Sequence, residues 1–287
     1  MDIISINNLK ISYGKNLVLD IPQMHIKKGM SVGIFGANGS GKSTLIKCVS
    51  NLLPYKGQVL INGIDIKENA SPLSKIGILI EEPALIGSMS GRENIKYFCK
   101  EFSSMMEYSK ILGVNDILDI KARKYSMGMK QKIAILLACV KGKDIILLDE
   151  PFNFLDIISI EKVINLLLKC CKNGSTVILT SHQLEISQRA VDMYYLLKNK
   201  QIYNCTAPQK GNGNKYLIEF FFKDDAESAK ELLINQNFEC IQNEFYIKVN
   251  IRDYNIFSIL QLLNNYQIKS FEDITYSVKE AYLAMEN

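Results

Sequence analysis

Ser31-Val-Gly-Ile-Phe-Gly-Ala-Asn-Gly-Ser-Gly-Lys-Ser43 decides the fold of this chain of 287 residues. The segment is an apolar strand that runs directly into a glycine-rich loop ending in Lys42 and Ser43, which is the pattern of a phosphate-binding loop. Such a loop aims its backbone N–H groups inward at phosphate oxygens, and the N-terminus of the following helix favours the same negative charge. The segment therefore predicts a nucleotide-binding α/β domain.

Each residue type in this loop has an expected role. The glycines let the backbone turn tightly, Lys42 is expected to reach the β- and γ-phosphates, and the hydroxyl of Ser43 is expected to ligate Mg²⁺. A helix with apolar residues on its inner side is predicted to begin at Thr44. The residues predicted here to contact ATP are Gly36, Asn38, Gly39, Ser40, Gly41, Lys42, Ser43 and Thr44.

Composition excludes several classes of protein. A hydrophobic content of 47% can form the core of one large domain and a small one. The longest apolar run, Ile133 to Val140, is far shorter than the roughly 20 residues that cross a bilayer, and the N-terminus lacks the layout of a secretory signal, so we expect a cytoplasmic protein. The seven cysteines are scattered without a Cys-x-x-Cys pair, which argues against a disulfide framework or a zinc site.

A net charge of +4 with dispersed lysines gives no reason to expect a nucleic-acid partner. Hydrophobic periodicity instead predicts a mixed sheet interrupted by a helical subdomain at about 84–140. Strand, helix and strand then follow in the order of a parallel sheet. The strands expected in this first domain, 1–205, are 3–12, 17–26, 31–35, 57–62, 76–80, 144–148 and 176–180, with a helix at 159–172.

The polar segment 206–214, with glycines and a proline, predicts a linker. Periodic structure resumes in 215–287, where we expect a small α+β domain of ferredoxin-like order, closed by a final helix from Val278. The elements expected before that helix are strand 216–222, helix 225–236, strands 238–242 and 244–249, helix 253–264 and strand 268–271.

The second motif is Ile145-Ile-Leu-Leu-Asp-Glu-Pro151, a buried strand that delivers two carboxylates to its C-terminal end, where ligands bind in open α/β sheets. Two carboxylates so close together repel each other, and a bound cation would stabilise them. Asp149 is predicted to hold Mg²⁺ through water, and Glu150 to act as the general base that polarises the attacking water. His182 follows another apolar strand, where its side chain can contact the γ-phosphate and the same water.

With these motifs in this order, residues 3–204 resemble the ATP-binding subunits of ABC transporters. The resemblance implies ATP hydrolysis, an adenine-stacking role for Tyr13, and a signature segment at Tyr125-Ser-Met-Gly-Met-Lys-Gln131 that binds the ATP held by an opposing subunit. Ser126 and Gly128 are the residues expected to grip that γ-phosphate. The resemblance therefore implies a homodimer or heterodimer in which two ATP molecules are sandwiched between the subunits. The loop Asn153-Phe-Leu-Asp156 is expected to communicate across this interface.

Three residues depart from the family pattern. Met127 stands where the family has glycine and Met129 where it has glutamine, while Glu81 replaces the glutamine that usually touches the metal. A carboxylate at position 81 adds negative charge beside Mg²⁺, and we expect Glu81 to be a metal ligand. Together with the signature segment, it makes the chain similar to the subgroup that exports bacitracin and lantibiotic-type peptides or confers immunity to them.

The resemblance implies a motor that powers a separate multi-span membrane permease and lies at the inner face of the cell membrane through that permease. Two alternatives stay open: a soluble ABC ATPase that acts on ribosomes or DNA, and an exporter of another substrate, such as a drug, a lipid or a polysaccharide. A single phosphate loop and the absence of a long coiled coil weigh against the soluble class, and the glutamate at position 81 weighs against an importer. The sequence does not identify the cargo.

Overall fold

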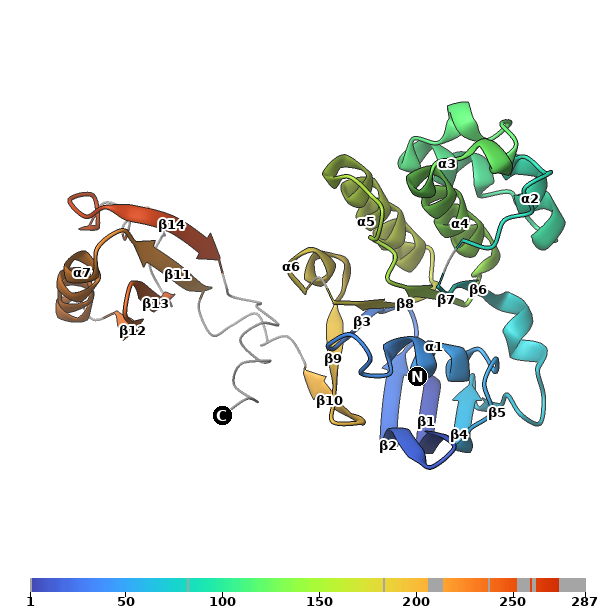
Figure 1. Cartoon of the computed structure of the whole chain (residues 1–287), viewed down its shortest axis with the longest axis horizontal. Helices are drawn as coiled ribbons and strands as arrows, with labels where there is room; N and C mark the ends of the chain where they lie inside the picture. The colour runs from blue at the N-terminus through green and yellow to red at the C-terminus, as the bar shows by residue number, and fades with distance from the viewer. Residues whose placement is uncertain are drawn as a thin grey trace. The chain divides into compact units, whose positions relative to one another are not determined.

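The computed structural model forms two compact units, Met1–Cys205 and Thr206–Asn287, which are described separately (Figure 1). The structure describes residues 2–81, 83–182, 184–205, 214–236, 238–251, 259 and 262–273. Within these residues, no helix has both the length and the apolar character needed to span a bilayer.

A six-stranded sheet forms the centre of the first unit, in the order β10-β9-β3-β8-β7-β6. All neighbours in it pair in parallel except the hairpin of β9 and β10. Every residue of β3 and β7 is buried, which explains why both strands are nearly continuous apolar runs. The strands are β3 (Ser31–Phe35), β6 (Ile76–Leu79), β7 (Ile145–Asp149), β8 (Thr176–Ser181), β9 (Met193–Lys198) and β10 (Gln201–Cys205).

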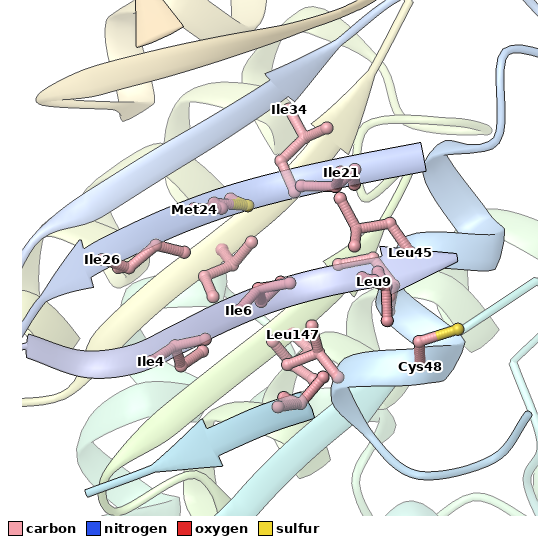
Figure 2. Close-up of a cluster of buried hydrophobic side chains, with 14 of the residues drawn as sticks. Ile4, Ile6, Leu9, Ile21, Met24, Ile26, Ile34, Leu45, Cys48 and Leu147 are labelled. Atoms are coloured by element: carbon pink, nitrogen blue, oxygen red, sulfur yellow. The ribbon is translucent and has the colours of Figure 1, made fainter. Parts of the chain in front are cut away.

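An antiparallel sheet, β2-β1-β4-β5, forms a second layer. Its strands are β1 (Asp2–Tyr13), β2 (Asn16–Lys27), β4 (Lys56–Ile61) and β5 (Ile64–Asp65). One hydrophobic core joins this sheet to the six-stranded sheet and to helix α1 (Lys42–Val49). Figure 2 shows Ile6 and Ile21 of the antiparallel sheet beside Leu45 of α1, Ile34 of β3 and Leu147 of β7. The helix that follows the phosphate loop is thus fixed by apolar side chains from both sheets.

The helical region lies between β6 and β7 in the chain. It contains α2 (Gly91–Phe98), α3 (Met105–Leu112) and α4 (Met127–Lys141), with 3₁₀ turns at Asn115–Ile117 and Ala122–Lys124. The remaining helical segments of this unit are the 3₁₀ turn Ser71–Lys75, α5 (Ile157–Lys172), α6 (Leu184–Ser187) and the 3₁₀ turn Gln188–Ala190. The mixed sheet with its helices confirms the α/β fold that the sequence predicts.

Local sequence explains where α2 and α4 lie. Ser90 and Glu93 form a capping box at the start of α2, and hydrogen bonds from the Ser90 backbone and from Lys121 lower the pKa of Glu93 to about 2. Helix α4 packs so closely on β6 that a Cβ at Gly77 would lie only 1.7 Å from the carbonyl oxygen of Ala138. Glycine at position 77 therefore permits the contact between the helical region and the sheet.

The second unit contains an antiparallel sheet in the order β12-β13-β11-β14. Its elements are β11 (Asn214–Phe220), α7 (Lys223–Asn235), β12 (Glu239–Asn243), β13 (Tyr246–Ile251) and β14 (Ile268–Asp273). Ile218, Leu233 and Ile247 belong to its separate core. The linker 206–213 and the helix expected from Val278 lie outside the described residues, as does most of the helix expected at 253–264. The ferredoxin-like order therefore stays a prediction.

Candidate nucleotide site

The glycine-rich loop connects β3 to α1. Gly39 and Gly41 have positive φ angles of 78° and 107°, and α1 begins without a side-chain hydrogen bond at its N-cap. The first N–H groups of a helix have no partner within the helix, so those of α1 are available to an anion. At Gly36, a Cβ would lie 2.6 Å from the carbonyl oxygen of Leu197. Glycine is required there by the close approach of β9.

Lys42 is buried at the start of α1. Its ammonium donates hydrogen bonds to the carbonyl oxygens of Gly36 at 2.8 Å and Ala37 at 3.2 Å. Its Nζ also lies 3.6 Å from Oε1 of Glu150. A buried charge needs such partners, and here they hold the ammonium inside the loop, facing the end of β7.

Two acids, the last residue of β7 (Asp149) and the residue that follows it (Glu150), contact Thr180 of β8. The hydroxyl of Thr180 donates to Oδ1 of Asp149 at 2.5 Å and accepts the backbone N–H of Glu150 at 3.0 Å. Glu150 has a φ of 48°, which is uncommon for a residue other than glycine. The Thr180 hydroxyl supports this backbone conformation and orients the carboxylate of Asp149. No sequence pattern pointed to Thr180.

His182 completes the group at the sheet edge. Its Nδ1 lies 2.9 Å from Oε2 of Glu150, and its backbone N–H donates to the same oxygen at 3.3 Å. The carboxylate of Glu150 therefore lies between an ammonium from the loop and an imidazole from the end of β8. The structure brings together three residues that were predicted as site residues from separate segments of the chain: Lys42, Glu150 and His182.

The arrangement fits a nucleotide and a hard cation. The Ser40 hydroxyl oxygen is buried without a hydrogen-bond partner among the described residues, and a buried polar atom without a partner is costly. A phosphate group in the loop would supply one. No cluster of three or more His, Cys, Asp or Glu residues in the described part of the chain is suited to a metal. Ser43 and Asp149 supply few oxygen ligands, which suits Mg²⁺, because this ion completes its shell with phosphates and water.

Glu81 has a described partner outside the loop, Lys47. It follows β6 with a φ of 57°, and its carboxylate forms an ion pair with Lys47 of α1. Its expected role as a metal ligand stays a prediction. Tyr13, at the end of β1, has 55% of its surface exposed, so its ring is accessible to a stacking partner, and its role also stays a prediction.

The signature segment forms the start of α4. The Ser126 side chain caps the helix by accepting the N–H of Met129 at 3.2 Å. A Cβ at Gly128 would lie 2.9 Å from the carbonyl oxygen of Phe154. The bare backbone at position 128 therefore permits the loop after Glu150 to approach α4. The expected contacts of Ser126 and Gly128 with the ATP of a second subunit stay predictions.

Gln131 links α4 to the segment after Glu150. It is buried, and its Nε2 donates to the carbonyl oxygen of Pro151 at 3.0 Å. Gln131 is the last residue of the signature segment, and its sequence position gave no reason to expect this contact. No local sequence signal distinguishes it, because it stands between Lys130 and Lys132, before the apolar run begins at Ile133.

Gln131→Leu is expected to destabilise the protein by about 1–3 kcal/mol, because a side chain of similar size would leave the Pro151 carbonyl buried without this donor. A denaturant titration followed by fluorescence or circular dichroism measures the effect. Gln58→Leu, at a partly exposed position of β4, serves as the control. Equal stability of the Gln131 variant and the wild type would contradict the role given to this hydrogen bond.

Comparison with known proteins agrees with this geometry. Residues 19–153 match the sequence family described as ABC transporter. The chain is 31% identical over 239 residues to the bacitracin transport ATP-binding protein of Enterococcus faecalis, covering 80% of this chain and 78% of that protein. It is 30% identical to the lantibiotic transport ATP-binding protein of Streptococcus pyogenes, covering 76% of this chain and 95% of the relative.

Solved structures agree at the level of the fold. The structure titled as an ATP-binding subunit of an ABC transporter superposes with a TM-score of 0.66 at 19% identity, and the match covers 91% of this chain and 99% of that one.

Proposed function

We propose that this chain, which belongs to the family of ABC transporter ATP-binding subunits, is the motor of an exporter or immunity system for antimicrobial peptides. Family members bind and hydrolyse ATP and work with a separate membrane permease. The observation that carries the proposal for the catalytic site is the position of Glu150 between Lys42 and His182.

Each of these residues has a chemical task in the proposed reaction. Lys42 binds the β- and γ-phosphates from the loop, and Glu150 accepts the proton of the water that attacks the γ-phosphate. His182 orients that water and stabilises charge on the γ-phosphate. Ser43 and Asp149 would hold Mg²⁺, which would neutralise charge on the phosphate oxygens.

We further propose that two ATP-binding subunits close around two ATP molecules. Ser126 and Gly128 of each subunit would grip the γ-phosphate held by the other. Three large apolar side chains beside the loop after Glu150 support such an interface: Phe154, Ile157 and Ile158 are 64%, 79% and 70% exposed. Residues of this kind are covered at protein–protein interfaces. Loss of the γ-phosphate would remove the contact that favours closure, so hydrolysis would reopen the pair.

The proposed cargo and location come from the relatives. The two named relatives are transport proteins for bacitracin and for a lantibiotic, and Glu81 in place of glutamine supports the same subgroup. With no candidate span among the described residues, the chain would lie at the inner face of the membrane through its permease. A drug, a lipid or a polysaccharide is the alternative cargo, and unchanged sensitivity to these peptides in the deletion strain described below would favour one of them.

The test uses a tagged Glu150→Gln chain that is produced in its host cell and purified in mild detergent with ATP. The proposal expects a multi-span membrane protein to copurify, and to copurify less when ADP replaces ATP. Ribosomal or DNA-associated proteins in its place would overturn the motor proposal.

For the cargo, deletion of the chain's gene is expected to raise sensitivity to bacitracin or lantibiotic peptides. The wild-type chain should restore resistance and the Glu150→Gln chain should not. Altered sensitivity only to a non-peptide drug would overturn the peptide proposal and leave the motor proposal standing.

A further inference from the structure

One buried hydroxyl joins the two acids at the end of β7. Thr180 is fully buried in β8, a strand that lies between β7 and β3 in the sheet. It stands directly opposite Asp149 in the register of β7 and β8, and such register partners have their side chains on the same face of a sheet. The hydroxyl of Thr180 therefore faces the carboxylate of Asp149.

A threonine hydroxyl has one proton to donate and lone pairs that accept, and Thr180 uses both. The proton is donated to Oδ1 of Asp149 at 2.5 Å, and the oxygen accepts the backbone N–H of Glu150 at 3.0 Å. Asp149 is only 5% exposed, so its carboxylate needs a donor of this kind. A hydrogen bond to a charged acceptor is stronger than one between neutral groups, so this contact restricts the orientation of the carboxylate.

The second contact of the hydroxyl acts on the backbone of Glu150. The φ of 48° at this residue lies in the left-handed region, which residues other than glycine adopt at an energetic cost. Strained backbone of this kind persists only where the surrounding structure determines it, and it is concentrated at functional sites. Loss of the Thr180 hydroxyl would remove an acceptor from the N–H of the strained residue and allow the backbone at the proposed base to relax.

We propose that Thr180 is a positioning residue for ATP hydrolysis, because its single hydroxyl sets the carboxylate of Asp149 and the backbone of Glu150 relative to each other. Thr180 acts through these two groups and not by contact with the nucleotide. The inference rests on the proposed function, since it deepens the account of the same site. Outer partners that orient a metal ligand typically contribute about 10- to 100-fold to activity or metal affinity.

Thr180→Val tests this role in the full chain, because valine has nearly the same shape and suits a buried strand but has no hydroxyl. Steady-state phosphate release at saturating ATP and Mg²⁺ measures kcat. The value is expected to fall about 10- to 100-fold below that of the wild type.

A second measurement does not depend on turnover. The affinity for a fluorescent ATP analogue is determined in EDTA and in Mg²⁺, and the ratio of the two affinities is the Mg²⁺ contribution. In Thr180→Val this ratio is expected to fall about 10-fold, because Asp149 loses the donor that orients it. Affinity in EDTA should stay at the wild-type value, because the phosphate loop is unchanged.

Thr176→Val is the matched control at the other end of the same strand. Thr176 is also fully buried, and its hydroxyl also accepts a backbone N–H, from Gly29 at 2.9 Å. This variant loses a comparable hydrogen bond away from the site, so it should keep the wild-type kcat and Mg²⁺ ratio. Thermal unfolding curves of both variants show whether a loss of activity follows from a loss of stability.

The pair Thr180→Ser and Thr180→Ala separates the hydroxyl from the methyl group and decides the question if the valine variant does not fold. Both variants lose the methyl group, and only serine keeps the hydroxyl. The serine variant is expected to keep a kcat close to that of the wild type, and the alanine variant to lose about 10- to 100-fold.

The outcomes distinguish two failures. A folded Thr180→Val chain with a wild-type kcat or a wild-type Mg²⁺ ratio, or equal losses in the serine and alanine variants, would overturn the positioning role. ATP hydrolysis by the wild type would then still support the proposed function. A wild-type chain that neither binds nor hydrolyses ATP would overturn both.

Discussion

Glu150→Gln is expected to slow ATP hydrolysis by about 10²- to 10⁴-fold, the usual contribution of a general base, while ATP binding persists. Glutamine has the same shape but cannot accept the water's proton. Its carboxamide oxygen can still face Lys42, which lies 3.6 Å from the native carboxylate. Steady-state phosphate release measures the rate, and equilibrium binding of a fluorescent ATP analogue measures the affinity.

The matched control is Glu161→Gln, which removes a carboxylate of α5 that pairs with Arg189 outside the site. It should hydrolyse ATP at close to the wild-type rate. A Glu150→Gln chain that hydrolyses ATP at the wild-type rate would contradict the assignment of Glu150 as the base.

Lys42→Ala is expected to weaken ATP binding by about 10- to 100-fold, because hydrogen bonds to charged groups contribute about 1.5–3 kcal/mol. The ammonium is already inside the loop, where it donates to the carbonyl oxygens of Gly36 and Ala37. A phosphate in the loop would therefore meet a positioned cation. Titration with a fluorescent ATP analogue measures the loss.

Lys172→Ala, an exposed position in the last turn of α5, controls for the loss of a lysine. A thermal unfolding curve shows whether the Lys42 variant keeps its fold. Wild-type affinity in a folded Lys42→Ala chain would show that nucleotide does not bind at this loop.

The central fold could be predicted from local patterns. The continuous apolar runs of β3 and β7 fit only strands that are covered on both faces, and the glycines after β3 predicted the loop into α1. Because ligands bind at the C-terminal ends of parallel strands, Asp149 and Glu150 were predicted to face the nucleotide. The structure places Glu150 3.6 Å from Lys42 of the phosphate loop, and the roles of both residues toward ATP stay predictions.

Other contacts depend on packing between segments that are far apart in the chain. The Thr180 hydroxyl reaches Asp149 only because β8 pairs with β7 in this register. The pair of Lys47 and Glu81 depends on how α1 packs beside β6. No local pattern encodes either distance, so both were found only in the structure.

The signature helix shows the same limit. The resemblance to ABC transporter subunits predicts that Ser126 and Gly128 face a second subunit, but it does not predict the contacts that α4 makes within its own chain. Gln131 reaches the segment after Glu150, and Gly128 allows the Phe154 carbonyl to approach. Through Pro151, the segment after Glu150, the proposed base, is therefore hydrogen-bonded to the signature helix.

The measurement that tests the motor most directly is the oligomeric state of the full Glu150→Gln chain in ATP with Mg²⁺ and in ADP with Mg²⁺, determined by sedimentation velocity. The account predicts a dimer, twice the 32.5 kDa of the chain, in ATP and a monomer in ADP, because Ser126 and Gly128 would grip only a γ-phosphate. The same oligomeric state in both nucleotides would contradict closure driven by ATP.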